Sequence, residues 1–459
     1  MPDWVDIFLH ELLLFAAVGL FVGGLDDLLV DAIWVIRLVW RRQVIFRIYK
    51  PASMETLAPP DRPGRIAILI GAWREDAVIG RMLRTALARI DHDDYRIYVG
   101  TYANDHRTIA EIRTIARADG RIRLVEDGVL GPTTKGECLN RVWRALLRDE
   151  AVENTRFKAV VIHDAEDVIH SAELKLFDRM IEHFDLVQLP VLPIPSPASR
   201  WVAGHYCDEF SEAHHRQLVV RELLGAGVPS AGVGCAISRQ AMGRMALHGG
   251  GKPFDEHCLT EDYEIGLRLA QLGYRGAFVS VPATEGGMPV AVRAHFPETI
   301  ETAVRQKTRW MVGIALAGWD RLGWHGHWAE LWMRLRDRRA MLAALVISAG
   351  YASLLLWVIS LAGHYIMATT PEPLPSGLML LIQLNGFLLL WRAAMRFVSV
   401  RKFYGTREGL RSVPRIVTSN IIAMLAARRA LLQYWKLLRG HALRWDKTCH
   451  VFPQALPAE

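Results

Sequence analysis

Three apolar stretches of the chain are long enough to cross a membrane. They run over residues 7–25, where His10 and Glu11 are the polar exceptions, over 341–367 and over 374–391. About 20 apolar residues in a helix span the roughly 30 Å hydrocarbon layer of a bilayer. The last two stretches are separated by Thr-Thr-Pro-Glu-Pro, which suits only a tight exterior turn. The pattern therefore predicts an N-terminal anchor and a transmembrane hairpin.

The first apolar stretch is followed by a segment that carries acidic residues. Asp26, Asp27 and Asp31 alternate with apolar residues as far as Trp40. Two interpretations fit: an amphipathic helix that leaves the membrane, or an acidic face packed against protein. Because the sequence starts without a basic region and has no small-residue cleavage site after the apolar stretch, we expect residues 1–50 to form an uncleaved anchor.

Two further stretches have the composition of helices that lie in the membrane interface. Tryptophans stand among histidines over 319–332, and apolar residues alternate with basic ones over 413–438. We expect an interfacial helix within 319–340, a transmembrane hairpin over 341–395, and a second interfacial helix with a C-terminal tail within 396–459.

The segment between the first and second spans has a different pattern. A proline-rich linker over 51–64 is followed by short β-rich runs that alternate with helical stretches. This alternation predicts an α/β domain with a mostly parallel sheet, occupying 51–318 together with the linker. The clearest predicted strands are 65–71, 95–100, 122–125 and 158–163, and the clearest predicted helices are 78–89, 108–118 and 135–148.

Charge and cysteine content indicate where the protein lies in the cell and which kinds of site are absent. The net charge of +7 is concentrated beside the apolar stretches. These flanking residues are Arg37, Arg41, Arg42, Arg47, Lys50, Arg334, Arg336, Arg338, Arg339, Arg392, Arg396, Arg401 and Lys402. The distribution predicts a cytoplasmic domain and a periplasmic N-terminus at a bacterial inner membrane, with no nucleic-acid partner. The five cysteines form no C-x-x-C pair, which argues against a zinc site and a disulfide framework.

Acidic residues directly follow the fourth predicted strand. They form the turn Asp164-Ala-Glu166-Asp167. A parallel sheet binds its ligand beyond the carboxyl ends of its strands, and paired carboxylates there can hold Mg²⁺ or Mn²⁺. Such a cation would neutralise a diphosphate leaving group. The alternative is an acidic cap for the following helix.

Polar residues also follow the other predicted strands. Ala72 and Glu75 come after the first, Asp105 comes after the second, and Lys135 begins the helix after the third. Glu75 and Asp105 could hydrogen-bond a base or ribose, and Lys135 could face a diphosphate. The alternative is that these are ordinary solvated loop residues.

Thr260-Glu261-Asp262 precedes a predicted helix over 263–272. A carboxylate held at a helix start in a cleft can act as the general base for an acceptor hydroxyl. The alternative is an N-cap with a charged first turn.

A later motif places Gln306, Arg309 and Trp310 at i, i+3 and i+4, on one face of a predicted helix. Arginine offers a donor fork for phosphate and tryptophan a flat surface for a sugar ring. The alternative is a basic amphipathic helix on the membrane.

Two other features are open to more than one interpretation. Residues 230–238 look like a glycine-rich strand in which Gly232 and Gly234 would let a ligand or backbone approach, although a simple bulge fits as well. His163 abuts the acidic turn and is either an outer ligand or a satisfied core residue.

In this order, the motifs resemble those of membrane-bound family 2 glycosyltransferases of the cellulose-synthase-like kind. That family has an acidic uridine-binding pair, a D-x-D metal motif, a T-E-D base motif and Q-x-x-R-W. The matching residues are Glu75 and Asp105, Asp164-Ala-Glu166, Thr260-Glu261-Asp262 and Gln306-Lys-Thr-Arg309-Trp310, within a resemblance that covers 65–438. Segments 13–21, 136–140 and 445–453 are similar to NfrB-like bacterial inner-membrane proteins, named for a role in phage adsorption. Glu166 stands where most relatives have aspartate.

The resemblance implies a GT-A-type, Rossmann-like domain that binds a nucleotide sugar, expected to be UDP-linked, and inverts the anomeric centre. The implied donor-binding residues are Ala72, Glu75, Asp105, Lys135 and Asp164, and the implied metal ligands are Asp164 with Glu166 or Asp167. Asp262 would be the base, and Glu261, Gln306, Arg309 and Trp310 would serve the acceptor and diphosphate.

The implied function is polysaccharide synthesis and export at the inner membrane, with a glycan or lipid-linked acceptor, membrane lipid around the helices, and an envelope or outer-membrane export partner. Alternatives are single-sugar transfer to a lipid carrier and a non-catalytic scaffold or phage-receptor component. Longer relatives continue into a domain that responds to cyclic di-GMP. Because this sequence stops soon after Pro453, we expect no direct control by that nucleotide.

Overall fold

Seven strands form one mixed sheet in the computed structural model, which describes residues 3–441, 451–453 and 456. The strand order is β3-β2-β1-β4-β6-β5-β7, and β6 runs antiparallel to both of its neighbours while the other pairings are parallel. The strands are β1 Ile66–Gly71, β2 Tyr95–Gly100, β3 Ile122–Val125, β4 Ala159–His163, β5 Leu186–Gln188, β6 Cys235–Ser238 and β7 Gly276–Phe278. The predicted mostly parallel sheet is confirmed, and the four predicted strands are correct to within one residue.

Helices cover both faces of this sheet, because successive strand residues point to opposite sides. Ile66, Ile68 and Ile70 of β1 pack with α3, α4 and α6, whereas Ala67 and Leu69 pack with α5, α9 and α10. These helices are α3 Ile79–Arg89, α4 His106–Ala118, α5 Lys135–Glu153, α6 Glu173–Met180, α9 Arg239–His248 and α10 Glu261–Gln271. The helices predicted over 78–89, 108–118 and 135–148 are present, the last one extending further.

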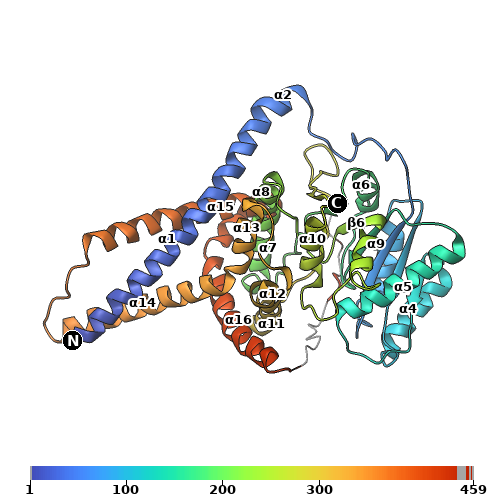
Figure 1. Ribbon diagram of the computed structural model, residues 1–459. Helices are drawn as coiled ribbons and strands as arrows, with labels where there is room; N and C mark the ends of the chain where they lie inside the picture. Colours follow the sequence, from blue (N-terminus) through green and yellow to red (C-terminus); the bar gives the residue numbers. More distant parts are fainter. Residues whose placement is uncertain (1–2, 442–450, 454–455, 457–459) are drawn as a thin grey trace.

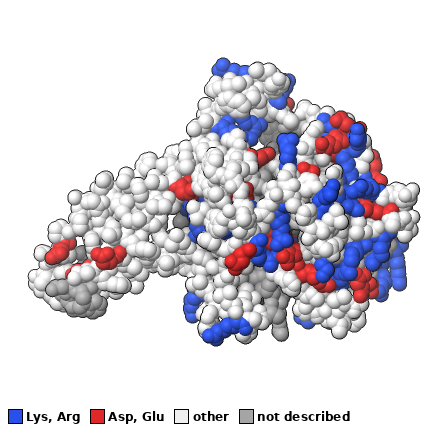
Figure 2. Space-filling model, viewed as in Figure 1, with Lys and Arg blue, Asp and Glu red and all other residues white. Residues whose placement is uncertain are grey.

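Three long helices project together from the sheet domain (Figure 1). They are α1 Asp3–Trp40, α14 Ala340–Ile366 and α15 Ser376–Ser412, and each is long and apolar enough to cross a membrane. The N-terminus lies at the far end of the projection, near the loop that joins α14 to α15 (Figure 1). Lysine and arginine gather over the opposite part of the molecule (Figure 2). α15 extends beyond residue 391, where the predicted span ends, and kinks at Gly405, where φ is 81°.

The acidic segment of α1 is packed against protein, which confirms the second of the two interpretations. A single helix covers both the anchor and this segment. The pairs are Asp26 with Arg336 and Arg339, Asp27 with Arg336, Arg339 and Arg392, and Asp31 with Arg216. The aspartates therefore join α1 to three other segments of the chain.

The segment expected to hold one helix within 319–340 forms two, and its position in the membrane interface stays a prediction. Two helices, α12 Gly318–Leu322 and α13 Trp328–Arg338, are separated by a turn in which Gly323 and Gly326 adopt positive φ. The tryptophan-rich pattern did not indicate that one side of α13, which includes Arg334 and Arg338, is buried.

Helix α16, Arg415–Leu438, packs against α11 and α14. Its other face exposes apolar residues such as Ile421 and Trp435, which suits the predicted interfacial position. Trp445 to His450 of the tail motif lie outside the described residues, but Phe452 packs into the sheet domain's core and the Pro453 carbonyl accepts a hydrogen bond from Arg81 at 2.9 Å.

The remaining elements connect the sheet domain to the long helices. They are the π-helical segments η1 Arg41–Ile45, η2 Ala213–Gln217 and η3 Met311–Ala317, and the helices α2 Phe46–Ile48, α7 Val202–Glu212, α8 Leu218–Leu223 and α11 Ile300–Trp310.

Candidate active site

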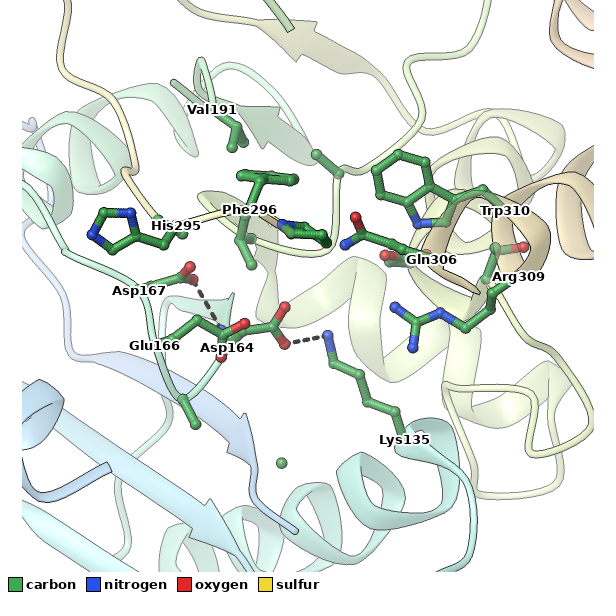
Figure 3. Close-up of a pocket in the computed structure, with 18 of the residues that line it drawn as sticks. Lys135, Asp164, Glu166, Asp167, Val191, His295, Phe296, Gln306, Arg309 and Trp310 are labelled. Carbon is green, nitrogen blue, oxygen red and sulfur yellow. Dashed lines mark hydrogen bonds and ion pairs between the residues drawn. The ribbon is translucent and has the colours of Figure 1, made fainter. Parts of the chain in front are cut away.

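A cavity of about 350 Å³ opens at the carboxyl ends of β1 and β4 (Figure 3). Its volume lies in the range of small-molecule sites. Ten of the predicted site residues line it: Glu75, Lys135, Asp164, Glu166, Asp167, Glu261, Asp262, Gln306, Arg309 and Trp310. Residues separated by more than 200 positions in the sequence therefore line one cavity.

Ala72 and Asp105 do not line this cavity. Ala72 is buried and its N–H donates to the Gly100 carbonyl at 2.9 Å. Asp105 precedes α4, and its Oδ2 accepts a hydrogen bond from the Arg74 N–H at 2.5 Å. Asp105 thus shapes the loop that carries Glu75 to the cavity, and its contact with a nucleoside stays a prediction.

The turn after β4 is shaped by Asp167. Asp167 Oδ2 accepts from the Asp164 N–H at 2.9 Å and lies 2.8 Å from His163 Nδ1. Asp164, Glu166 and Asp167 all line the cavity, but one oxygen of Asp167 is committed to the turn and to His163. This commitment favours Glu166 over Asp167 as the second carboxylate for a cation.

His163 is a satisfied core residue. It is fully buried, and its Nε2 lies 2.7 Å from Glu173 Oε1 on the side away from Asp167. Burial opposes its charge, but the Glu173 and Asp167 carboxylates outweigh burial and raise the pKa of His163 to about 10. A positive imidazolium thus holds two buried carboxylates together beneath the turn.

His163→Gln should destabilise the protein by about 3 to 5 kcal/mol, because it leaves two buried carboxylates without their cation. The measurement is the melting temperature of the purified protein. His248→Gln, which changes an exposed histidine at the end of α9, is the matched control. Equal melting temperatures for the two variants would contradict this account of His163.

Lys135 faces the same turn from the start of α5. Thr134 caps that helix by accepting from the Glu137 N–H, and Lys135 Nζ lies 2.6 Å from Asp164 Oδ1. Burial would lower the pKa of Lys135, but the Asp164, Glu261 and Asp262 carboxylates raise it. The ammonium is therefore charged and lies between the acidic turn and the base motif.

The base motif occupies the first turn of α10, which begins at Glu261, two residues earlier than predicted. Thr260 holds the cap position, and Asp262 Oδ1 accepts from the Tyr263 N–H at 2.7 Å. Burial raises the pKa of both Glu261 and Asp262. Asp262 is therefore not the capping residue, and burial favours its ability to take up a proton.

A glycine loop makes room for Asp262. The strand predicted over 230–238 is reduced to β6, and Gly232 in the preceding loop adopts φ 80°. A β-carbon on Gly232 would lie 2.3 Å from Asp262 Oδ2. The close approach that the glycines suggested is thus made by the side chain of the candidate base.

Gln306, Arg309 and Trp310 reach the cavity from one face of α11, as predicted (Figure 3). Sequence reasoning missed Phe210 and Phe296, which also line it; their ring centroids are 4.9 Å apart. Neither residue stands in a motif, so only the fold shows that the two rings lie together and that the Phe210 ring lies 6.4 Å from that of Trp310.

Comparison with known proteins places the chain in a family. The family described as "Glycosyltransferase like family 2" matches residues 63–313, more than half of the chain. This chain belongs to glycosyltransferase family 2. The resemblance that the motifs carried is confirmed.

Two curated relatives match almost the whole chain. Bacteriophage adsorption protein B of Escherichia coli K12 and bacteriophage N4 adsorption protein B of E. coli O157:H7 are each 35% identical to it over 481 aligned positions. The alignment covers 98% of this chain and 64% of each relative. The chain thus spans less than two thirds of the length of these relatives.

A solved structure shares the fold. The mannosyltransferase PcManGT from Pyrobaculum calidifontis, in complex with GDP-Man and Mn²⁺, is 16% identical with a TM-score of 0.52, covering 93% of this chain and 99% of the other. At this identity the likeness concerns the fold alone. It confirms the predicted GT-A-type architecture for the family 2 domain.

The family 2 cavity has the donor atoms that a hard divalent cation requires. In the described part of the chain, no group of three or more His, Cys, Asp or Glu side chains could hold a metal by itself. Mg²⁺ is commonly held by one or two carboxylates, with substrate phosphates and water completing the shell. Asp164 and Glu166 fit that requirement. His295, which lies near Asp167 in Figure 3, has a pKa lowered by burial and offers a neutral nitrogen at the same wall.

Proposed function

We propose that the chain is an inverting membrane glycosyltransferase that transfers sugar from a metal-bound nucleotide sugar to a growing glycan at the cytoplasmic face of the inner membrane. The observation that carries this proposal is the single cavity that joins the acidic turn after β4, Lys135, Asp262 and the α11 side chains. A non-catalytic scaffold would need none of these groups to converge.

The residues divide into donor and acceptor roles. Asp164 and Glu166 would hold Mg²⁺ or Mn²⁺, which when bound neutralises diphosphate charge. Lys135 and Arg309 supply fixed positive charge for the departing diphosphate, with Gln306 as a further donor. Asp262 accepts the proton of the acceptor hydroxyl, and because this hydroxyl attacks opposite the leaving group, the anomeric configuration inverts.

The acceptor side favours a sugar ring. Trp310, Phe210 and Phe296 give the cavity flat aromatic surfaces on which the apolar face of a sugar can stack. A glycan product at the cell surface would also be consistent with the names of the relatives, which refer to phage adsorption. Export would then require an envelope or outer-membrane partner, or self-association of the three helices.

A panel of nucleotide sugars tests the proposal. The full chain, purified in lipid nanodiscs, is incubated with Mn²⁺ and UDP-linked or GDP-linked hexoses and N-acetylhexosamines, and nucleoside diphosphate release and product glycans are measured. We expect turnover with one donor, UDP-linked by the family resemblance, and an inverted anomeric configuration by NMR. Absence of turnover with every donor would contradict the proposed activity.

Topology gives a separate prediction, because the arginine clusters beside the spans favour the cytoplasm. Alkaline phosphatase fused after residue 200, in the sheet domain, should be inactive, and the same enzyme fused within the 367–375 loop should be active. A green fluorescent protein fusion at residue 200 is the complementary control and should fluoresce. Active phosphatase at residue 200 would reverse the proposed orientation.

A further inference from the structure

The helix that carries Asp262 is held by a hydrogen-bond network outside the cavity. Tyr263, the next residue, donates its hydroxyl hydrogen bond to Asp337 Oδ2 on α13 at 2.5 Å. Asp337 is also bound by Arg221, whose Nη1 lies 3.0 and 2.7 Å from its two carboxylate oxygens. Tyr263 and Arg221 are buried, so this contact ties the first turn of α10 to α13.

A second contact ties the same turn to α12. Glu264 is buried, and Arg321 Nε donates to its Oε1 at 2.6 Å. Both ends of α12 are in turn held by α13, since Arg334 Nη1 donates to the Leu322 carbonyl at 2.8 Å and Arg338 Nη2 to the Gly318 carbonyl at 2.7 Å. Helices α12 and α13 therefore form one unit that binds α10, the helix of the candidate base, at the adjacent residues Tyr263 and Glu264.

Further contacts of α13 reach the membrane helix α1. Arg336 pairs with Asp26 and, at 3.0 Å, with Asp27. Trp332 Nε1 donates to Asp26 Oδ1 at 2.6 Å. The Arg336 side chain is only 9% exposed, so the pairing is shielded from solvent screening. One helix of 11 residues thus contacts the proposed membrane anchor and the proposed base helix through neighbouring side chains.

We propose that α13 is a positioning element through which the membrane helix α1 sets the placement of Asp262. Asp26, Trp332, Arg336 and Asp337 are positioning residues in this inference, which rests on the proposed function because it takes Asp262 as the base. The physical reason is that buried ion pairs fix discrete geometries, and a base displaced by about 1 Å can lose up to about 100-fold in rate. The proposed donor-binding residues lie elsewhere: Glu75 follows β1, Lys135 begins α5, and Asp164 and Glu166 follow β4.

The test compares Asp26→Asn, Asp337→Asn and the double variant in full-length protein in nanodiscs. Two readouts are used: amide hydrogen exchange of peptides within 258–271 without substrate, and kcat and KM with the donor that the panel identifies. Arg113→Gln, which removes the exposed pair of Arg113 with Glu126, is the matched control. Trp332→Phe is a milder variant, since it removes one hydrogen bond to Asp26, and replaces Asp26→Asn if that variant does not fold.

We expect Asp26→Asn to speed exchange within 258–271 and to lower kcat by between about tenfold and 100-fold, with the donor KM changed by less than about twofold. The double variant should be little worse than Asp337→Asn alone, because both changes interrupt one linkage. Unchanged exchange in Asp26→Asn and Trp332→Phe, or additive losses in the double variant, would overturn the inference. If the wild-type protein turns over no donor, the proposed function fails, but the exchange measurement still decides whether α1 holds α10 through α13.

Discussion

Asp262→Asn is expected to reduce sugar transfer by about 10² to 10⁴-fold while nucleotide binding and melting temperature stay close to wild type. The substitution removes the carboxylate that would take the acceptor proton. The amide oxygen of asparagine can still accept the hydrogen bond that Asp262 Oδ1 receives from the Tyr263 N–H. The first turn of α10 should therefore keep its shape.

The competing interpretation, an N-cap with a charged first turn, predicts a different result. Asparagine serves such a turn about as well as aspartate, so transfer would survive. The structure places Thr260 at the cap position and Asp262 in an acidic first turn, which fits this interpretation as well, so the variant has to decide between the two.

Three measurements on one variant separate these outcomes: calorimetric binding of Mn²⁺ with UDP and with GDP, the melting temperature, and product formation. Asp320→Asn makes the same chemical change at an exposed position on the nearby α12 and should leave all three unchanged. Near wild-type transfer by Asp262→Asn would remove the base assignment.

The parts of the fold that could be predicted are those whose signal is local. β1 is a run of apolar residues buried on both faces, as parallel strands are, and its bounds were predicted to within one residue. The three-residue strands β5 and β7 were not predicted, because so short a segment is defined by distant partners: Leu186 pairs with Ile237 on one side and Gly276 on the other.

The parts that could not be predicted depend on how elements fold against one another. Arg334 and Arg338 are buried in α13, although arginines are rarely buried without a partner. Arg334 pairs with Glu330 and donates to the Leu322 carbonyl, and Arg338 donates to the Gly323 carbonyl, once the turn between α12 and α13 has formed. The same limit applies within the site. Their places after the first two predicted strands grouped Glu75 and Asp105, but only backbone geometry shows that Glu75 reaches the cavity while Asp105 supports its loop.

Removal of divalent metal is also expected to have a large effect on sugar transfer. Excess EDTA should abolish transfer, and Mn²⁺ or Mg²⁺ should restore it. The reason is the charge of the cavity. Among the described lining residues, the acidic ones are Glu75, Asp164, Glu166, Asp167, Glu261, Asp262 and Glu298, whereas Lys135 and Arg309 are the lysine and arginine. A diphosphate entering such a site meets net repulsion unless a cation accompanies it.

Single variants then assign the ligands. Asp164→Asn and Glu166→Gln should each weaken Mn²⁺-dependent binding of UDP or GDP in calorimetry while the melting temperature changes little. Asp167→Asn should instead lower the melting temperature, because Asp167 Oδ2 binds both His163 and the Asp164 N–H. The opposite pattern, with Glu166→Gln silent and Asp167→Asn losing metal-dependent binding in a stable protein, would make Asp167 the second ligand. Full turnover in excess EDTA would contradict metal dependence altogether, since the fixed positive charge of Lys135 and Arg309 would then be enough to bind the diphosphate and release it.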